Sequence, residues 1–315
     1  MRDTMSNKTM IRADAEKMVS TTELAFHGDI YRSAEQILMC SDVIDKAQFC
    51  QQLFHIWSSL SPQARAEATA TANANSTAVR QIDAPGRPAK PELVDARHLV
   101  KRALGTPHGR VALVHSLAHI EFNAINLAVD AVYRFRDMPA DYIGDWLKVA
   151  ADEGEHFLLL NVRLQSLESF YGALPAHDGL WDMARRTDHD VLVRMALVPR
   201  ILEARGLDVA PPMIDKLKHL GDTQTADILQ RIYTDEITHV EVGNRWFRHV
   251  CEQRSLDGTQ VFRDLLKGQN SAWLRSPYNR EARLQAGFNE SELALIKQME
   301  AEYKAAQASD RASRS

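Results

Sequence analysis

Two stretches of the chain, ADEGEH and TDEITH, repeat the pattern Asp-Glu-x-x-His about eighty residues apart. Each lies in a region whose apolar residues recur with the period of an amphipathic helix. Residues three apart in a helix lie about 60° from one another around its axis, so Glu153 shares a face with His156, and Glu236 with His239. A carboxylate and an imidazole in this arrangement can bind one metal ion together. The fold must therefore place two such pairs where a metal can reach them.

The whole chain reads as helical, because alternating β-branched runs closed by tight Asn-Gly or Asp-Gly turns are absent. The segment GLDVAPP is expected to end a long helix that begins at about residue 182, since glycine terminates helices and proline cannot continue one. A short helix is expected at 213–220. A last helix should begin after Asn289, with Glu292 at the reciprocal capping position. We expect four long helices at about 106–135, 140–171, 182–205 and 222–252.

The stretch STAVRQIDAPGRPAKPE holds three prolines and should be an extended connector on the surface. The fold class predicted is all-α, with extra helices before and after a central bundle. The expected domains are an N-terminal helical segment at 1–75, a proline-containing linker at 76–105, a four-helix bundle at 106–252, and a C-terminal loop and helix at 253–315.

Two further glutamates complete a repeated order along the long helices. Glu121 lies 32 residues before Glu153, and Glu203 lies 33 residues before Glu236. The order Glu, Glu-x-x-His, Glu, Glu-x-x-His, with one element in each helix, is the ligand set of di-iron carboxylate four-helix bundles. One Glu-x-x-His pair alone is more often a solvated surface contact. The ordered set favours a metal site with the ligands Glu121, Glu153, His156, Glu203, Glu236 and His239.

Charge supports this interpretation. Four glutamates in an apolar bundle would each cost several kcal/mol unless protonated or paired. Two divalent cations neutralise four carboxylates, and two imidazoles disfavour Ca²⁺ and Mg²⁺. Zinc prefers tetrahedral sites with fewer carboxylates. The expected cofactors are therefore two metal ions, iron first and manganese second.

Other polar residues have predicted supporting roles. Asp152 and Asp235 each precede a ligand glutamate and are expected to accept a hydrogen bond from the histidine of the opposite hairpin; a solvent-facing acid is the alternative. His119 lies about 200° from Glu121, so it and His115 are expected to be buried hydrogen-bonding groups. Pro199 should kink the third helix. The arginines of that helix are expected to form a solvated basic side, or an anion site: Arg185, Arg186, Arg194, Arg200 and Arg205.

Composition excludes several functional classes. The formal net charge is −4 and the isoelectric point is near 6.3, so nucleic acid and anionic membranes are not expected partners. The three cysteines lack CxxC spacing, which favours a reducing cytosol over disulfides or structural zinc. The N-terminal residues lack a signal-peptide core, and the most apolar stretch, at 111–122, is too short and polar to span a bilayer. We expect a cytoplasmic protein.

The chain resembles the ferritin-like superfamily, and more closely a bacterial ferritin-like family of unknown function. The resemblance rests on AHIEFNAINLAVDAVYRF, DWLKVAADEGEHF, YGALPAHDGLW, VPRILEARGLDVAP, DEITHVEVGNRWF and, less specifically, SPYNREARLQAGF. It covers about residues 85–290. It implies a four-helix bundle with one long crossover and a dinuclear metal site at the six ligands named above. Superfamily members with this ligand order include rubrerythrin-type peroxidases, the ribonucleotide reductase radical subunit, acyl desaturases, multicomponent monooxygenases and a tRNA-modifying hydroxylase.

The function expected is a non-haem dinuclear metal oxidoreductase that uses O₂ or peroxide to oxidise or hydroxylate a small organic substrate. An electron-donor protein and a second copy of the chain are the protein partners considered. One alternative is an iron-handling protein, either a ferroxidase or storage protein or a rubrerythrin-like peroxidase. Another is a metal-binding helical protein without catalysis. Storage requires a hollow multimer, for which the terminal segments seen here are ill suited.

Overall fold

Helices account for all the regular secondary structure in the computed structural model, which describes residues 24, 28–75, 78–100, 102–267 and 274–312. Within these residues there is no strand, only an isolated bridge between Leu93 and Ala176. The all-α prediction is confirmed. None of the described helices combines the length and apolar composition needed to cross a membrane.

The chain divides into two units, one of residues 1–188 with 218–228 and the other of residues 189–217 with 229–315. The four predicted domain segments stay a prediction. The helices of the first unit are α2 (Ile30–Met39), α3 (Val43–Ser59), α4 (Pro62–Asn75), the 3₁₀ turn η1 (Ala96–His98), α5 (Pro107–Arg134), α6 (Ala140–Ser166) and α7 (Gly179–Arg186). Those of the second are α8 (Val191–Leu197), the π-helical turn η2 (Val198–Glu203), α9 (Ala204–His219), α10 (Thr223–Gln253), α11 (Gly258–Lys267), α12 (Arg280–Gln285) and α13 (Glu290–Ala312); the end of α9 and the start of α10 fall in the first unit.

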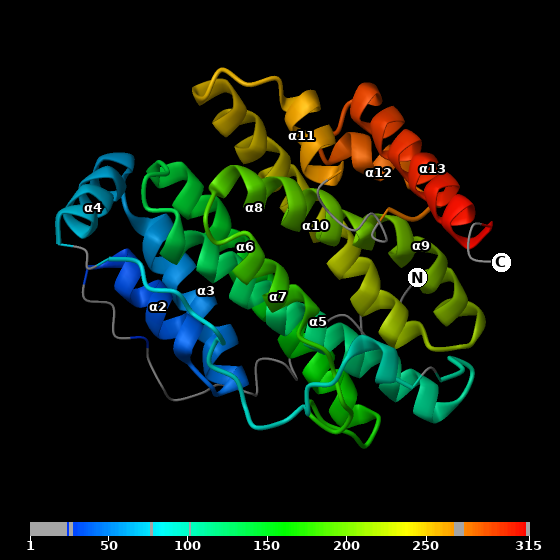
Figure 1. Cartoon of the computed structure of the whole chain (residues 1–315). Helices are drawn as coiled ribbons and strands as arrows, with labels where there is room; N and C mark the ends of the chain where they lie inside the picture. Colours follow the sequence, from blue (N-terminus) through cyan, green and yellow to red (C-terminus); the bar gives the residue numbers. More distant parts are fainter. Residues whose placement is uncertain (1–23, 25–27, 76–77, 101, 268–273, 313–315) are drawn as a thin grey trace. The chain divides into compact units, whose positions relative to one another are not determined.

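The first unit is built on the hairpin of α5 and α6. Thr106 caps α5 by accepting a hydrogen bond from the Gly109 N–H at 3.0 Å, and Pro107 supplies a first residue with a preset φ. Helix α3 packs along α6, α2 packs along α5, and the two N-terminal helices also pack on each other (Figure 1). The N-terminal helices therefore lie directly on the two helices that carry Glu121 and Glu153.

Gly154, inside the ADEGEH stretch, permits the close approach of α3 to α6. A Cβ atom at this position would lie 2.7 Å from the carbonyl oxygen of Ala47 in α3. Backbone atoms cannot yield as a flexible side chain can, so the two helices would have to separate. The corresponding position of the second motif, Ile237, carries a large side chain. The glycine is thus a packing feature of the first motif alone.

We expect Gly154→Ala to lower the free energy of unfolding by about 2 kcal/mol, because overpacking a buried helix contact costs on that order. Gly206→Ala is the matched control, since Gly206 is also helical but has no atom within 4 Å of its would-be Cβ. That control should raise the free energy of unfolding by about 0.5 kcal/mol through the lower entropy of the unfolded chain. Urea denaturation of both variants measures the difference. Equal changes in the free energy of unfolding for the two variants would show that α3 does not pack closely against Gly154.

The proline-containing connector is extended but partly buried. No described residue from 78 to 92 is helical, as predicted, yet Ile82 is buried, so the expectation of a purely surface segment was wrong. Trp181 donates its indole N–H to the Asp83 carbonyl at 3.0 Å. The ammonium of Lys46, itself fully buried, donates to the carbonyls of Leu38 and Gly86 and to the side-chain oxygen of Asn126. These bonds fasten the connector to α2, α3 and α5.

In the second unit, the predicted third helix is broken and then extended. A turn at residues 187–190 separates α7 from α8, and the α-helix gives way to the π-helical turn η2 at Val198, next to the predicted kink at Pro199. The expected end at GLDVAPP was wrong, because α9 continues through Pro211 and Pro212 and includes the short helix predicted at 213–220.

A distant side chain makes this continuation through proline feasible. Pro211 lacks an N–H, so it leaves the Leu207 carbonyl without its helical partner. The side-chain amide of Asn279 donates to that carbonyl at 3.2 Å. At α13 the predicted capping box is confirmed, with reciprocal hydrogen bonds between Asn289 and Glu292 at 2.9 and 3.0 Å. The predicted solvated basic side is wrong for Arg194 and Arg200, which are both buried.

Candidate metal centre

Three of the predicted ligands come together in the first unit. Glu121 from α5 and Glu153 and His156 from α6 each offer one ligand atom, and these atoms all lie within 4.8 Å of one another. The three residues are 2%, 1% and 0% exposed. His156 Nδ1 lies 3.2 Å from Glu153 Oε2 and 3.6 Å from Glu121 Oε2. The helical spacing of the motif therefore produces the shared face that the sequence predicted.

The electrostatics of this cluster would favour a bound cation. Burial raises the pKa of Glu121 well above its usual value, and the neighbouring Glu153 carboxylate raises it further, whereas His156 acts in the opposite direction. Two carboxylates this close cannot both be ionised cheaply in an apolar interior. A metal ion among them would remove that cost. We name Glu121, Glu153 and His156 the first Glu/His set.

The stability that Glu121 contributes to the metal-free chain should therefore fall as pH rises. An acid whose pKa is higher folded than unfolded binds more protons in the folded state between the two values, so its contribution to the free energy of unfolding is greatest below about pH 4.5 and is lost as pH rises toward the folded pKa. Wild type should lose stability relative to Glu121→Gln as pH rises above about 4.5. Urea titrations with a chelator present measure this. Parallel stability curves for the two proteins would contradict the assignment.

The remaining predicted ligands lie in the second unit. Glu203 is the last residue of η2 and is half-buried, and Glu236 and His239 lie one turn apart on α10. His239 is 1% exposed, and its Nδ1 lies 3.8 Å from Glu236 Oε2. The second Glu-x-x-His pair thus has the same internal arrangement as the first. Its union with the first Glu/His set in one dinuclear centre stays a prediction.

The two aspartates that precede ligand glutamates pair with cations on their own helices. Asp152 forms an ion pair with Lys148, and Asp235 accepts a hydrogen bond from Arg231 Nε at 2.7 Å. Each pair spans one helical turn. The predicted bond from either aspartate to a histidine of the other hairpin stays a prediction.

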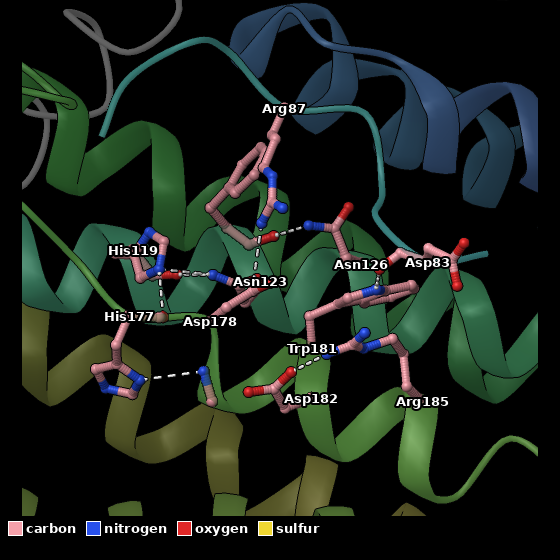
Figure 2. Close-up of polar contacts among 12 residues, drawn as sticks. Asp83, Arg87, His119, Asn123, Asn126, His177, Asp178, Trp181, Asp182 and Arg185 are labelled. Atoms are coloured by element: carbon pink, nitrogen blue, oxygen red, sulfur yellow. Dashed lines mark hydrogen bonds and ion pairs between the residues drawn. The ribbon is translucent and has the colours of Figure 1, made fainter. Parts of the chain in front are cut away.

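Two histidines of α5, His115 and His119, hold the loop that follows α6. His119 Nε2 lies 3.0 Å from the His177 carbonyl (Figure 2), which can only accept, so Nε2 carries the proton. The other ring nitrogen, Nδ1, then accepts a hydrogen bond from the Tyr171 hydroxyl at 2.9 Å. His115 Nε2 accepts from the Gly172 N–H at 3.0 Å. Burial lowers the pKa of both imidazoles, that of His115 to about 4. The prediction of buried hydrogen-bonding histidines is confirmed.

Two residues of the first Glu/His set are each followed in the chain by a phenylalanine of one aromatic cluster, and sequence reasoning did not locate this cluster. Phe122 and Phe157, which follow Glu121 and His156 in the chain, have ring centroids 5.8 Å apart, and Tyr171 lies within 6 Å of both. The positions of both phenylalanines directly after predicted ligands are visible in the sequence and could have indicated this cluster. The contact of Tyr171 with them could not have been predicted, because Tyr171 comes from the loop after α6.

Comparison with known proteins places this architecture in a family. A family model described as "Protein of unknown function (DUF455)" matches residues 39–294. The chain belongs to this family. It is 43% identical over 220 residues to an uncharacterized protein of Haemophilus influenzae, an alignment that covers 68% of this chain and 76% of that protein. No solved structure matches. The DUF455 match spans all six predicted ligands and both helices that frame the first Glu/His set.

Proposed function

We propose that this DUF455 protein is a non-haem dinuclear metal oxidoreductase with a ferritin-like four-helix bundle, which uses O₂ or peroxide to oxidise or hydroxylate a small organic substrate. The observation that carries the proposal is the first Glu/His set, in which two carboxylates and an imidazole converge in a buried place. Such a set is costly for a protein to maintain unless it binds a cation.

The donor set fits iron or manganese. Carboxylate oxygens together with imidazole nitrogen favour first-row transition metals over Ca²⁺ or Mg²⁺, and the lack of a thiolate ligand weighs against structural zinc. We propose that Glu203, Glu236 and His239 hold a second ion. The repeated order of ligands in the sequence and the Glu/His arrangement on α10 support this second site.

The metals, when bound, would supply the redox chemistry. The side chains have separate tasks. Glu121 and Glu153 must lose any shared proton before they bind a cation, so metal uptake should release protons and strengthen as pH rises. His156 offers a neutral nitrogen on the same helix face.

Anaerobic loading with Fe(II), followed by O₂, tests the proposal by absorption spectroscopy. We expect a ligand-to-iron charge-transfer band in wild type and its loss in His156→Ala. His55→Ala is the control, because His55 is an exposed histidine of α3 in the same unit. Equal spectra for wild type and His156→Ala would contradict the site. Growth of a ferric mineral would favour the iron-handling alternative, and bound iron that O₂ leaves unchanged would favour metal binding without catalysis.

A further inference from the structure

A segment near the C-terminus, Asn279–Glu292, makes buried contacts on both sides of Glu203 in the second unit. It comprises α12, the following turn and the start of α13. The turn holds Gly287, whose φ of 88° suits glycine, and Phe288. Two residues of α10 fix it: Asn244 donates its side-chain amide to the Ala286 carbonyl and Arg248 donates to the Gly287 carbonyl, both at 2.8 Å.

Before Glu203 in the chain, the contact is a buried ion pair. Arg200, inside the π-helical turn η2, is 0% exposed and is paired with Glu292. The carbon of its guanidinium lies 4.1 Å from the ring centroids of both Phe247 and Phe262. Arg200 Nε and Nη1 have no hydrogen-bond acceptor among the described residues. The cation is therefore stabilised by one carboxylate and by aromatic faces.

After Glu203, α12 holds the start of α9. Arg283 donates to both carboxylate oxygens of Asp208 at 2.9 and 2.8 Å and to the Ala204 carbonyl at 3.3 Å. The Asn279 backbone N–H also donates to Asp208, at 2.9 Å. The ring of Phe288 lies 5.2 Å from the Arg200 guanidinium carbon and 5.3 Å from that of Arg283. One ring thus contacts both Arg200, which precedes Glu203 in the chain, and Arg283, which binds the residues that follow it.

The turn is also restrained from the direction of α10. A Cβ atom on Gly243 would lie 2.2 Å from the Pro199 ring, so η2 packs against α10 with no spare room. Gly243 lies four residues after His239, on the same helical face. Isolated π-helical turns are poorly stabilised by their own hydrogen bonds and recur at functional sites. Here the stabilisation comes from elsewhere in the unit.

We propose that the segment Asn279–Glu292 is a positioning element that holds the π-helical turn so that Glu203 is presented as a metal ligand. Arg200, Arg283 and Phe288 act through that turn and do not themselves bind metal. This role rests on the proposed function, because it takes Glu203 as a ligand. It gives the C-terminal helices a part in building the site.

Amide hydrogen exchange of the metal-free chain tests the positioning step. Glu292→Gln keeps the cap of α13 but removes the carboxylate paired with Arg200, and Phe288→Leu loosens both cation contacts without stranding a charge. We expect about tenfold faster exchange at residues 198–206 in each variant, with residues 230–240 of α10 unchanged. Glu290→Gln is the matched control, since Glu290 lies on the same helix as Glu292 and its ion pair with Arg280 of α12 is exposed. It should match wild type.

Iron and manganese binding of the same variants tests the consequence. We expect the affinity for one of the two ions to fall by about ten- to a hundredfold in Glu292→Gln and Phe288→Leu, and to be unchanged in Glu290→Gln. The positioning role is overturned if exchange in the turn is unchanged in the variants, or if exchange is accelerated equally throughout α10. If Glu292→Gln fails to fold, the exchange of Phe288→Leu decides the question. If the wild-type chain binds neither metal, the proposed function and the ligand role of Glu203 are overturned. Faster exchange at residues 198–206 in Glu292→Gln and Phe288→Leu would then still show that the segment holds the turn, so the two failures can be told apart.

Discussion

Glu153→Gln should reduce metal affinity by at least about a hundredfold. The same substitution should raise the free energy of unfolding of the metal-free chain. The first effect follows because a neutral amide replaces a charged ligand at the centre of the first Glu/His set. The second follows because Glu153 raises the pKa of Glu121 by placing a second acid beside it, and the amide removes that repulsion. The gain should be about 1 to 2 kcal/mol near pH 8.

Glu155→Gln is the matched control for this prediction. It lies two residues along the same helix, about 200° around the axis from Glu153, and is only half-buried. Calorimetric titration with Mn²⁺ and urea denaturation in chelator measure the two effects. A lower metal affinity together with a higher free energy of unfolding is the result expected for a ligand that is kept at the expense of stability. If Glu153→Gln lowered stability and left affinity intact, the carboxylate would be a structural residue.

His239→Ala should reduce the metal content from about two ions per chain to about one, because it removes the nitrogen ligand of the second predicted site and leaves the first Glu/His set complete. The second site lies on α10, whose Glu236 and His239 repeat the arrangement of Glu153 and His156. Elemental analysis after loading with Fe(II) and removal of free metal gives the stoichiometry.

His219→Ala serves as the control for His239→Ala, because His219 is an exposed histidine at the end of α9. It should retain the wild-type stoichiometry. A wild-type content in His239→Ala would remove α10 from the site. Complete loss of metal would show that the two ions bind only together.

Periodicity predicted the elements that position the ligands, and it failed where contacts from distant residues decide the structure. Helices α5, α6 and α10 lie within a few residues of their predicted bounds, because long amphipathic patterns are local information. The end of the third helix was misplaced, because the carbonyl freed by Pro211 is satisfied by Asn279, 72 residues away. The sequence near Pro211 gives no indication of the hydrogen bond from Asn279.

The candidate site shows the same division. The shared face of Glu153 and His156 follows from helical geometry, and so does the turn between Glu236 and His239. The approach of Glu121 to α6, by contrast, is a tertiary contact that the sequence suggested only through the order of its motifs. The burial of Arg200 was missed because an arginine in a basic helix ordinarily faces solvent. Its partner Glu292 comes from the first turn of α13, 92 residues away.

The proposed function requires that this chain hold two redox-active metal ions. Elemental analysis of wild-type protein, purified from cells without added metal or chelator, tests it most directly. We predict about two iron or manganese atoms in total per chain. A combined content below about a tenth of an atom per chain would contradict the account and leave the buried carboxylates of α5 and α6 without the cation that explains them.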